Sequence, residues 1–247
     1  MPAVEFYVVR HGKTRFNQEH KIQGWSNSPL TADGVDCALK AGVGLAQVPF
    51  SLMASSDLGR ARQTLAAILC GRVSGDMRAS LLEDLTAGRA PEASALQEAA
   101  GVPVCVDARL REWCYGDLEA QSGAKMGQVF DEGFGQHLSL AQLNDRLPEV
   151  ADVLADYDTS GRAERFPGIC NRLTAAFRDL GDRALSNGGG NVLVVTHSFV
   201  VRTLVYLLDR SRVNTPLQYP NASVTRISYD GQRFSLGAIA QTDHLKG

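Results

Sequence analysis

The sequence of 247 residues has few cysteines, and their spacing excludes two classes of protein. The five are Cys37, Cys70, Cys105, Cys114 and Cys170. Because the count is odd and no CxxC pair occurs, we expect neither a disulfide framework nor a cysteine zinc site. Reduced thiols are typical of the cytoplasm, so we expect a cytoplasmic protein. Glu5 and Arg10 interrupt the first apolar run, which is not typical of a signal peptide.

Long apolar runs and clusters of positive charge are also missing. No stretch approaches the roughly 18 apolar residues of a membrane span, so no membrane partner is expected. The formal net charge is −2 and no run of lysine and arginine occurs, which argues against a nucleic-acid partner. Any anion site must therefore be local. The chain also lacks internal repeats and low-complexity linkers, so we expect one domain over 1–247 with insertions at about 71–102 and 122–166.

Three short apolar runs predict buried strands, at 4–9, 50–55 and 191–196. Each strand ends in polar residues: Arg10-His11, then Ser55-Ser56-Asp57 leading to Arg60, then Thr196-His197-Ser198. If the strands are parallel neighbours, these ends meet at one edge of the sheet, where open α/β sheets bind ligands.

Helical spacing and capping residues indicate the elements between the strands. Thr31 with Asp33-Gly34 opens a helix whose apolar positions are Val35, Leu39, Val43 and Leu45/Ala46. The cluster 55–57 is a candidate N-cap for the next helix, and Ser198 is a candidate cap for a helix over 199–208. A long amphipathic helix is predicted over 167–185, and a β-hairpin over 222–239.

The second insertion carries an apolar stripe at helical spacing. Its members are Leu140, Leu143, Leu147, Val150, Leu154 and Tyr157. Pro148 is expected to kink this helix or to start a new one. Such a stripe is more often packing than ligand site, but its place between two motifs indicates a lid over the pocket.

Two arginines and two histidines around one point suit a phosphoryl group better than a metal ion. No carboxylate or thiol lies beside His11 or His197 in the sequence, so no metal site is expected. Guanidinium forks match phosphate oxygens, and phosphoryl transfer needs mainly positioning and charge stabilisation. A neutral imidazole can attack phosphorus, which makes His11 a candidate nucleophile and Arg10 a candidate clamp. The alternative for His11 is a strand-end histidine that completes a hydrogen bond.

Glu112 is a candidate for the proton transfers. A departing alkoxide needs a proton and an attacking water needs a base, and one carboxyl group can serve both in turn. The alternative is a solvated surface glutamate, the common fate of this residue type.

These residues also carry a family resemblance. The matching segments are Arg10-His11-Gly12-Lys13-Thr14, Asn17, Gln23-Gly24, Pro29-Leu30-Thr31, the run from Ser55 to Thr64, Leu110-Arg111-Glu112, Tyr115-Gly116 and Thr196-His197. In this order they resemble the histidine phosphatase superfamily, the phosphoglycerate mutase-like family. The resemblance implies an α/β fold, a three-layer αβα sandwich around a mostly parallel sheet with a helical cap insertion.

The resemblance also implies roles for the residues. His11 would be phosphorylated, Arg10, Arg60 and His197 would hold the phosphoryl group, and Glu112 would be the proton donor. The expected substrate-binding residues are Asn17, Gln23, Gly24 and Ser198. No metal and no dissociable cofactor are implied.

One departure from the family pattern bears on function. Mutases of the family tend to continue the glutamate with Arg-His-Tyr-Gly, whereas this chain has Trp113-Cys114-Tyr115-Gly116. We therefore expect a phosphomonoester hydrolase of the histidine acid type, acting through phosphohistidine on a small phosphorylated molecule. The alternatives are a cofactor-dependent phosphoglycerate mutase and a non-catalytic module that binds phospho-ligands. The natural substrate and the oligomeric state stay open.

Overall fold

The computed structural model of the protein describes residues 3–245, and its centre is a six-stranded sheet. The strands are β1 (Val4–Arg10), β2 (Phe50–Ser55), β3 (Val104–Val106), β4 (Gly190–Thr196), β5 (Val224–Tyr229) and β6 (Phe234–Leu236). Their order is β3-β2-β4-β1-β5-β6, with the first four parallel and the last two antiparallel. The expected mostly parallel α/β sheet is confirmed. Residues 1–2 and 246–247, the ends of the expected domain, lie outside the described residues.

The central strands are apolar on both faces because helices cover both. Along β1, Val4, Phe6 and Val8 pack into one core, whereas Tyr7 and Val9 pack into another on the opposite face. A strand buried on both faces reads as a continuous apolar run, which is why these strands could be found from the sequence.

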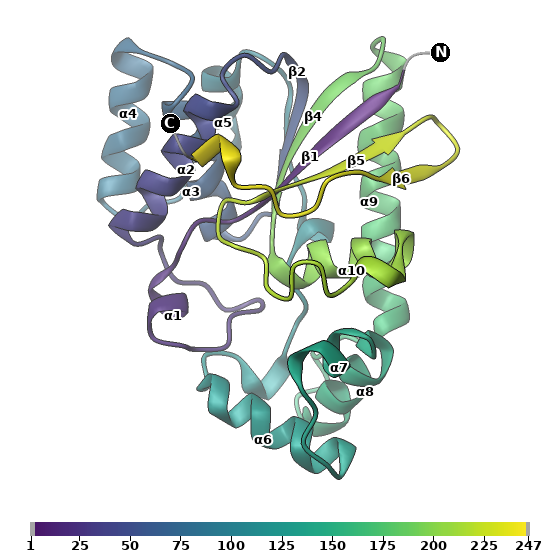
Figure 1. The fold of residues 1–247 in the computed structure, drawn as a ribbon. Coiled ribbons are helices and arrows are strands. Elements are labelled where there is room, and N and C mark those ends of the chain that lie inside the picture. Colours follow the sequence, from purple (N-terminus) through teal and green to yellow (C-terminus); the bar gives the residue numbers. More distant parts are fainter. Residues whose placement is uncertain (1–2, 246–247) are drawn as a thin grey trace.

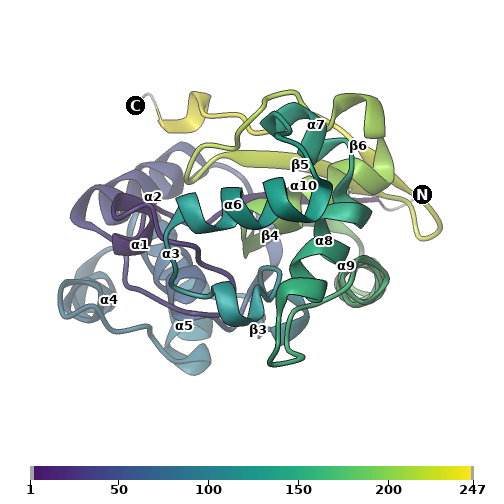
Figure 2. The ribbon, with the colours of Figure 1, turned by 90° about the horizontal axis from the view of Figure 1, so that it is seen from below.

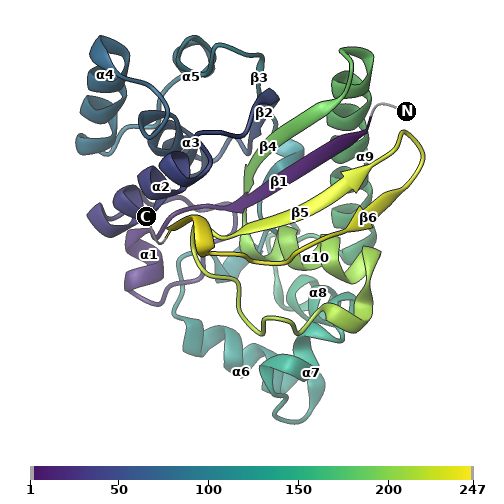
Figure 3. The same ribbon diagram turned by 45° about the horizontal axis from the view of Figure 1, so that its top comes forward.

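The helices form the two outer layers, as Figures 1 and 3 show. One layer contains α2 (Ala32–Gly44) and α3 (Gly59–Cys70), extended by α4 (Gly75–Thr86) and α5 (Ala93–Ala100). The other contains α9 (Phe166–Ser186) and α10 (Ser198–Leu208). This confirms the three-layer sandwich. Within residues 3–245, no helix is both long enough and apolar enough to cross a membrane.

The buried face of α2 differs in part from the prediction, although Leu45 at the end of the helix confirms it. Val43 is 55% exposed, and Val35 and Leu39 are only partly buried, whereas Ala38, Ala41 and Gly42 are fully covered. A Cβ added to Gly42 would lie 2.0 Å from the Ile68 carbonyl oxygen of α3. The two helices therefore approach through their smallest residues, and this close packing outweighs burial of the larger side chains.

Both predicted helix caps are wrong. Helix α3 begins at Gly59 after Leu58, and the Arg60 N–H donates to Asn27 Oδ1 at 3.1 Å. Helix α10 begins at Ser198 itself, and the Phe199 N–H donates to Glu112 Oε2 at 3.0 Å. In both cases the acceptor comes from a distant loop, so the cap could not be read from the local sequence.

The second insertion forms a separate helical layer below the sheet. It contains α6 (Gly123–Phe134), α7 (Leu140–Asn144) and α8 (Leu147–Tyr157), which lie in front of the sheet when seen from below (Figure 2). Pro148 stands in the first turn of α8, so it starts a new helix. Leu147, Val150 and Leu154 pack into the core, whereas Tyr157 is partly exposed. The first insertion forms α4 and α5, which both pack against α3.

The remaining elements are short. They are α1 (Arg15–Gln18), η1 (Ala108–Leu110), η2 (Gly116–Leu118), η3 (Arg210–Arg212) and η4 (Asp243–Leu245).

Candidate active site

The carboxyl ends of three neighbouring strands bring the predicted site residues together. In the parallel pair β1–β4, Arg10 is opposite Thr196, and in β2–β4, Ser55 is opposite Val195. The His11 N–H donates to the Thr196 carbonyl oxygen at 2.8 Å, just beyond the last pair of β1 and β4. His11 and His197 therefore leave adjacent strands at the same edge of the sheet, as expected.

The two imidazoles are buried and face each other. Their ring centroids lie 5.3 Å apart with an interplanar angle of 59°. Nδ1 of His11 lies 2.7 Å from the Gly12 carbonyl oxygen, which can only accept, so Nδ1 carries the hydrogen and Nε2 keeps a free lone pair. Both ring nitrogens of His197 are buried and have no hydrogen-bond partner among the described residues.

Two buried guanidinium groups lie beside the histidines. Arg60 is fully buried and donates to the Ser26 carbonyl oxygen at 2.9 Å and to the Gly24 carbonyl oxygen at 2.6 Å. Arg10 donates to the Tyr219 carbonyl oxygen. Within residues 3–245 the Nε atoms of both arginines lack a protein partner. Unpaired buried donors of this kind suit an anionic ligand.

The electrostatics keep the arginines charged and the histidines neutral. Burial lowers the pKa of Arg10 and of Arg60 to about 10, which leaves both protonated at neutral pH. Burial, followed by the charge of Arg60, lowers the pKa of His11 well below its usual value. Burial and then Arg60 also lower the pKa of His197. His11 therefore presents a neutral nitrogen to the site over the physiological range.

Glu112 is buried rather than solvated at the surface, which excludes the alternative that the sequence left open. Its Oε1 accepts the Trp113 N–H and its Oε2 accepts the Phe199 N–H, both at 3.0 Å. Burial raises the pKa of this carboxyl group, and the two N–H donors oppose the rise. A carboxyl group that holds its proton above the usual pH can donate it to a leaving group.

A pocket of about 270 Å³ opens onto Arg10, His11 and Glu112, whereas Arg60 and His197 are fully buried and do not line it. It is lined by Arg10, His11, Asn17, Lys21, Ile22, Gln23, Glu112, Tyr115, Gly123, Met126, Ser198 and Phe199. Asn17, Gln23 and Ser198 thus lie in the wall, whereas Gly24 lies behind it and contributes its carbonyl group to Arg60.

Sequence reasoning missed several residues of the wall. Lys21 and Ile22 stand directly before the Gln23-Gly24 motif, so their place in the chain was a usable signal. Gly123 and Met126 come from α6 and reach the pocket only because the cap helices lie below the sheet edge. This location agrees with the lid that we expected of the second insertion.

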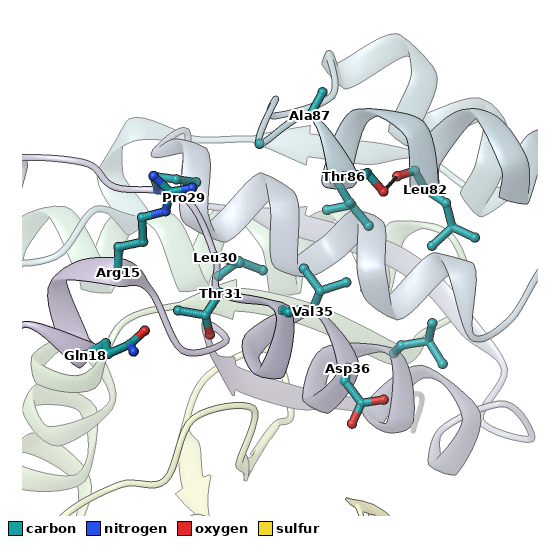
Figure 4. A pocket seen from close by; sticks show the side chains of 14 residues that line it. Arg15, Gln18, Pro29, Leu30, Thr31, Val35, Asp36, Leu82, Thr86 and Ala87 are labelled. Carbon is teal, nitrogen blue, oxygen red and sulfur yellow. Dashed lines mark hydrogen bonds between the residues drawn. The ribbon is translucent and has the colours of Figure 1, made fainter.

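A larger hollow of about 830 Å³ lies elsewhere, between α1, α2 and α4 (Figure 4). Its walls include apolar side chains such as Leu30, Val35 and Leu82, and the charged residues Arg15 and Asp36, which are exposed. None of the predicted site residues lines it. Because its charged groups are solvated, we assign the chemistry to the smaller pocket at the histidines.

Within residues 3–245, no group of three or more His, Cys, Asp or Glu side chains is arranged to hold a metal ion.

Comparison with known proteins gives the family. A model of the histidine phosphatase superfamily (branch 1) matches residues 6–86 and 88–242. The chain belongs to this superfamily. It is therefore an enzyme of phosphoryl transfer, and a phosphohistidine mechanism is typical of its family.

Similar proteins carry both mutase and phosphatase names, the latter including an α-ribazole phosphatase and a mycobacterial glucosyl-3-phosphoglycerate phosphatase among the structural neighbours. A probable phosphoglycerate mutase GpmB of Escherichia coli is 26% identical over 228 residues, which cover 92% of this chain and 85% of the relative. The crystal structure of a phosphoglycerate mutase from Bacillus anthracis is 29% identical with a TM-score of 0.83, covering 99% of this chain and 96% of that one. Bacillus stearothermophilus YhfR is 26% identical with a TM-score of 0.70, covering 98% and 99%.

Proposed function

We propose that this enzyme hydrolyses phosphomonoesters of small molecules by way of a phosphate bound covalently to His11. The observation that carries the proposal is the free Nε2 of a neutral His11, next to two buried guanidinium groups and a carboxyl group of raised pKa. These are the nucleophile, the charge stabilisation and the proton donor that the reaction needs.

In the first half-reaction, Nε2 of His11 attacks phosphorus. The N–P bond forms while the P–O bond to the alcohol breaks, and the proton of Glu112 goes to the departing oxygen. Arg10, Arg60 and His197 hold the phosphoryl oxygens during this transfer, which is mainly a matter of positioning and charge. Asn17, Gln23 and Ser198 contact the substrate from the wall, and Gly24 acts through its carbonyl group on Arg60.

In the second half-reaction, the Glu112 carboxylate takes a proton from water as the water oxygen attacks phosphorus. The N–P bond breaks, phosphate leaves, and both His11 and Glu112 return to their starting forms. One carboxyl group thus serves as acid and then as base, as microscopic reversibility requires.

Hydrolysis is favoured over a mutase reaction by the residues after Glu112. Trp113 is 1% exposed and donates its indole N–H to Thr203 Oγ1, and Cys114 is 3% exposed. Neither side chain lines the pocket, so the positions at which mutases of the family place Arg and His supply no cation here. The names of the relatives keep the mutase as the second candidate. We further propose that the enzyme works in the cytoplasm, where its five unpaired thiols would stay reduced.

The two candidates are separated by offering the enzyme p-nitrophenyl phosphate and, in a second reaction, 3-phosphoglycerate with the phosphate-donating cofactor that a mutase needs, both in the presence of EDTA. We expect release of free phosphate from p-nitrophenyl phosphate and no 2-phosphoglycerate. Formation of 2-phosphoglycerate would favour the mutase. Binding of phosphate without turnover of any ester in a substrate panel would favour a non-catalytic module.

A further inference from the structure

The carboxylate of Glu119 accepts an unusually large number of hydrogen bonds for a half-buried side chain. Oε1 accepts the N–H groups of Trp25 at 2.7 Å and Tyr115 at 3.1 Å. Oε2 accepts the N–H groups of Gly24 at 3.0 Å and Ser26 at 2.9 Å, and the Ser26 hydroxyl at 2.5 Å. Four of these five bonds come from residues 24–26, so Glu119 holds this loop from one side.

The same loop holds Arg60 from its other side. The guanidinium group donates to the carbonyl oxygens of Gly24 and Ser26, as described above. The peptide groups of the loop therefore lie between two charges. Their N–H groups face the Glu119 carboxylate, and their carbonyl groups face the Arg60 guanidinium. Each charge favours the peptide orientation that the other one needs, so the arrangement is mutually stabilising.

Gly24 shows how closely the loop is held against its support. A Cβ added there would lie 2.3 Å from Glu119 Oε1 and 2.3 Å from the Trp113 carbonyl oxygen. Any larger residue would push the loop away from Glu119. The glycine of the Gln23-Gly24 motif thus permits this close approach.

We infer that Glu119 is a positioning residue for Arg60, fixing through residues 24–26 the direction in which the guanidinium group meets the phosphoryl group. The inference rests on the proposed function, because it assigns Arg60 to the phosphoryl oxygens. Neither Glu119 nor Arg60 lines the pocket, and we assign Glu119 to positioning because its carboxylate is taken up by the N–H and hydroxyl donors that it holds. Its four bonds to residues 24–26 act on the reaction through Arg60, and its fifth bond, to the Tyr115 N–H, holds a residue of the pocket wall.

The test uses Glu119→Gln, which keeps the shape of the side chain but replaces one acceptor oxygen with an NH₂ group. That group cannot accept the N–H donors it would face. The matched control is Asp158→Asn. Asp158 also accepts five hydrogen bonds, from the N–H groups of 117, 160, 162 and 163 and the Ser160 hydroxyl, but holds a loop that does not contact Arg60.

The readouts are kcat/KM for p-nitrophenyl phosphate, the inhibition constant of inorganic phosphate, and the melting temperature. Each variant is made in the wild type and with Arg60→Met, which removes the charge but keeps the bulk.

Small misplacements of a catalytic group can cost up to about 10²-fold. We expect Glu119→Gln to lower kcat/KM and phosphate affinity by about tenfold in the wild type and by less than about twofold beside Arg60→Met. Asp158→Asn should change the melting temperature but neither constant.

Two outcomes would overturn the inference while leaving the proposed function intact. One is a Glu119→Gln variant that melts earlier but binds phosphate normally, as a merely structural role predicts. The other is an equal loss from Glu119→Gln with and without Arg60→Met. If Arg60→Met alone changes neither constant, the assignment of Arg60 in the proposed function fails as well. Should Glu119→Gln not fold, Ser26→Ala removes only the hydroxyl bond and should move the same constants in the same direction.

Discussion

His11 and His197 face each other with their ring centroids 5.3 Å apart, although they belong to opposite ends of the chain. The parallel pairing of β1 with β4 produces this relationship, because each histidine directly follows its strand. Burial and the charge of Arg60 keep both rings neutral. In the proposed reaction one ring attacks phosphorus while the other contacts its oxygens.

Glu112→Gln should slow the cleavage of phosphate esters, and the loss should be larger for esters with a more basic leaving group. An alkyl phosphate departs as a strongly basic alkoxide, so its phosphorylation burst should fall by about 10²- to 10⁴-fold. p-Nitrophenolate is a weak base, and the burst with p-nitrophenyl phosphate should fall much less. The measurement is the pre-steady-state burst rate with each ester, because later hydrolysis of phosphohistidine also uses this group.

A structural role for Glu112 predicts a different pattern. Its carboxylate also accepts the Phe199 N–H in the first turn of α10, so the variant could simply disturb that helix. Equal losses of the two burst rates, with a lowered melting temperature, would remove Glu112 from the proton-donor role.

His197→Gln should make the fold less sensitive to acid. The pKa of His197 is lowered in the folded protein, so between about 6.5 and that lower value the unfolded chain binds a proton that the folded chain does not. The contribution of His197 to the free energy of unfolding is fully present above pH 6.5 and is lost as the pH falls below this value. A single group contributes a slope of up to about 1.4 kcal/mol per pH unit.

The check is the free energy of unfolding from urea titrations at several pH values below 6.5. The wild type should lose stability more steeply than His197→Gln. His137→Gln is the control, because the His137 side chain is 83% exposed. If the wild type and His197→Gln give parallel curves, His197 is not held neutral by the fold.

Met126→Ala should change substrate preference more than phosphorylation chemistry. Met126 brings α6 of the cap into the pocket wall, away from the groups around His11. Each buried methylene contributes about 0.8 kcal/mol, or roughly fourfold in affinity. We therefore expect KM for a bulky ester such as naphthyl phosphate to rise several-fold, with little change in the burst rate.

Gln128→Ala, an exposed position on the same helix, is the control. A uniform fall in the burst rate with unchanged KM would contradict a role for the cap in specificity.

Much of the fold could be predicted because the local signals agree with the tertiary structure. The strands are continuous apolar runs, as strands buried on both faces must be, and Pro148 and Pro167 stand in the first turns of their helices. The buried face of α2 could not be predicted, since contact with α3 selects Ala38, Ala41 and Gly42 over larger residues. The helix caps that Asn27 and Glu112 provide could not be predicted either, because they depend on contacts between distant segments.

The site could be predicted in part for a related reason. Strand ends and motif order placed His11, Arg60 and His197 at one edge of the sheet, and the parallel pairing brings them there. The link from Glu119 to the 24–26 loop joins two motifs that are far apart in sequence. The contribution of α6 depends on how the cap docks, and periodicity carries no information about that.

The central claim is that His11 carries the phosphoryl group during turnover. The most direct measurement mixes the enzyme with p-nitrophenyl phosphate labelled at phosphorus, quenches within the burst in alkaline denaturant, and maps the label by peptide mass spectrometry. We predict label on the peptide that contains His11, and neither label nor turnover in His11→Ala. Label on a serine or cysteine, or full turnover by His11→Ala, would contradict the account.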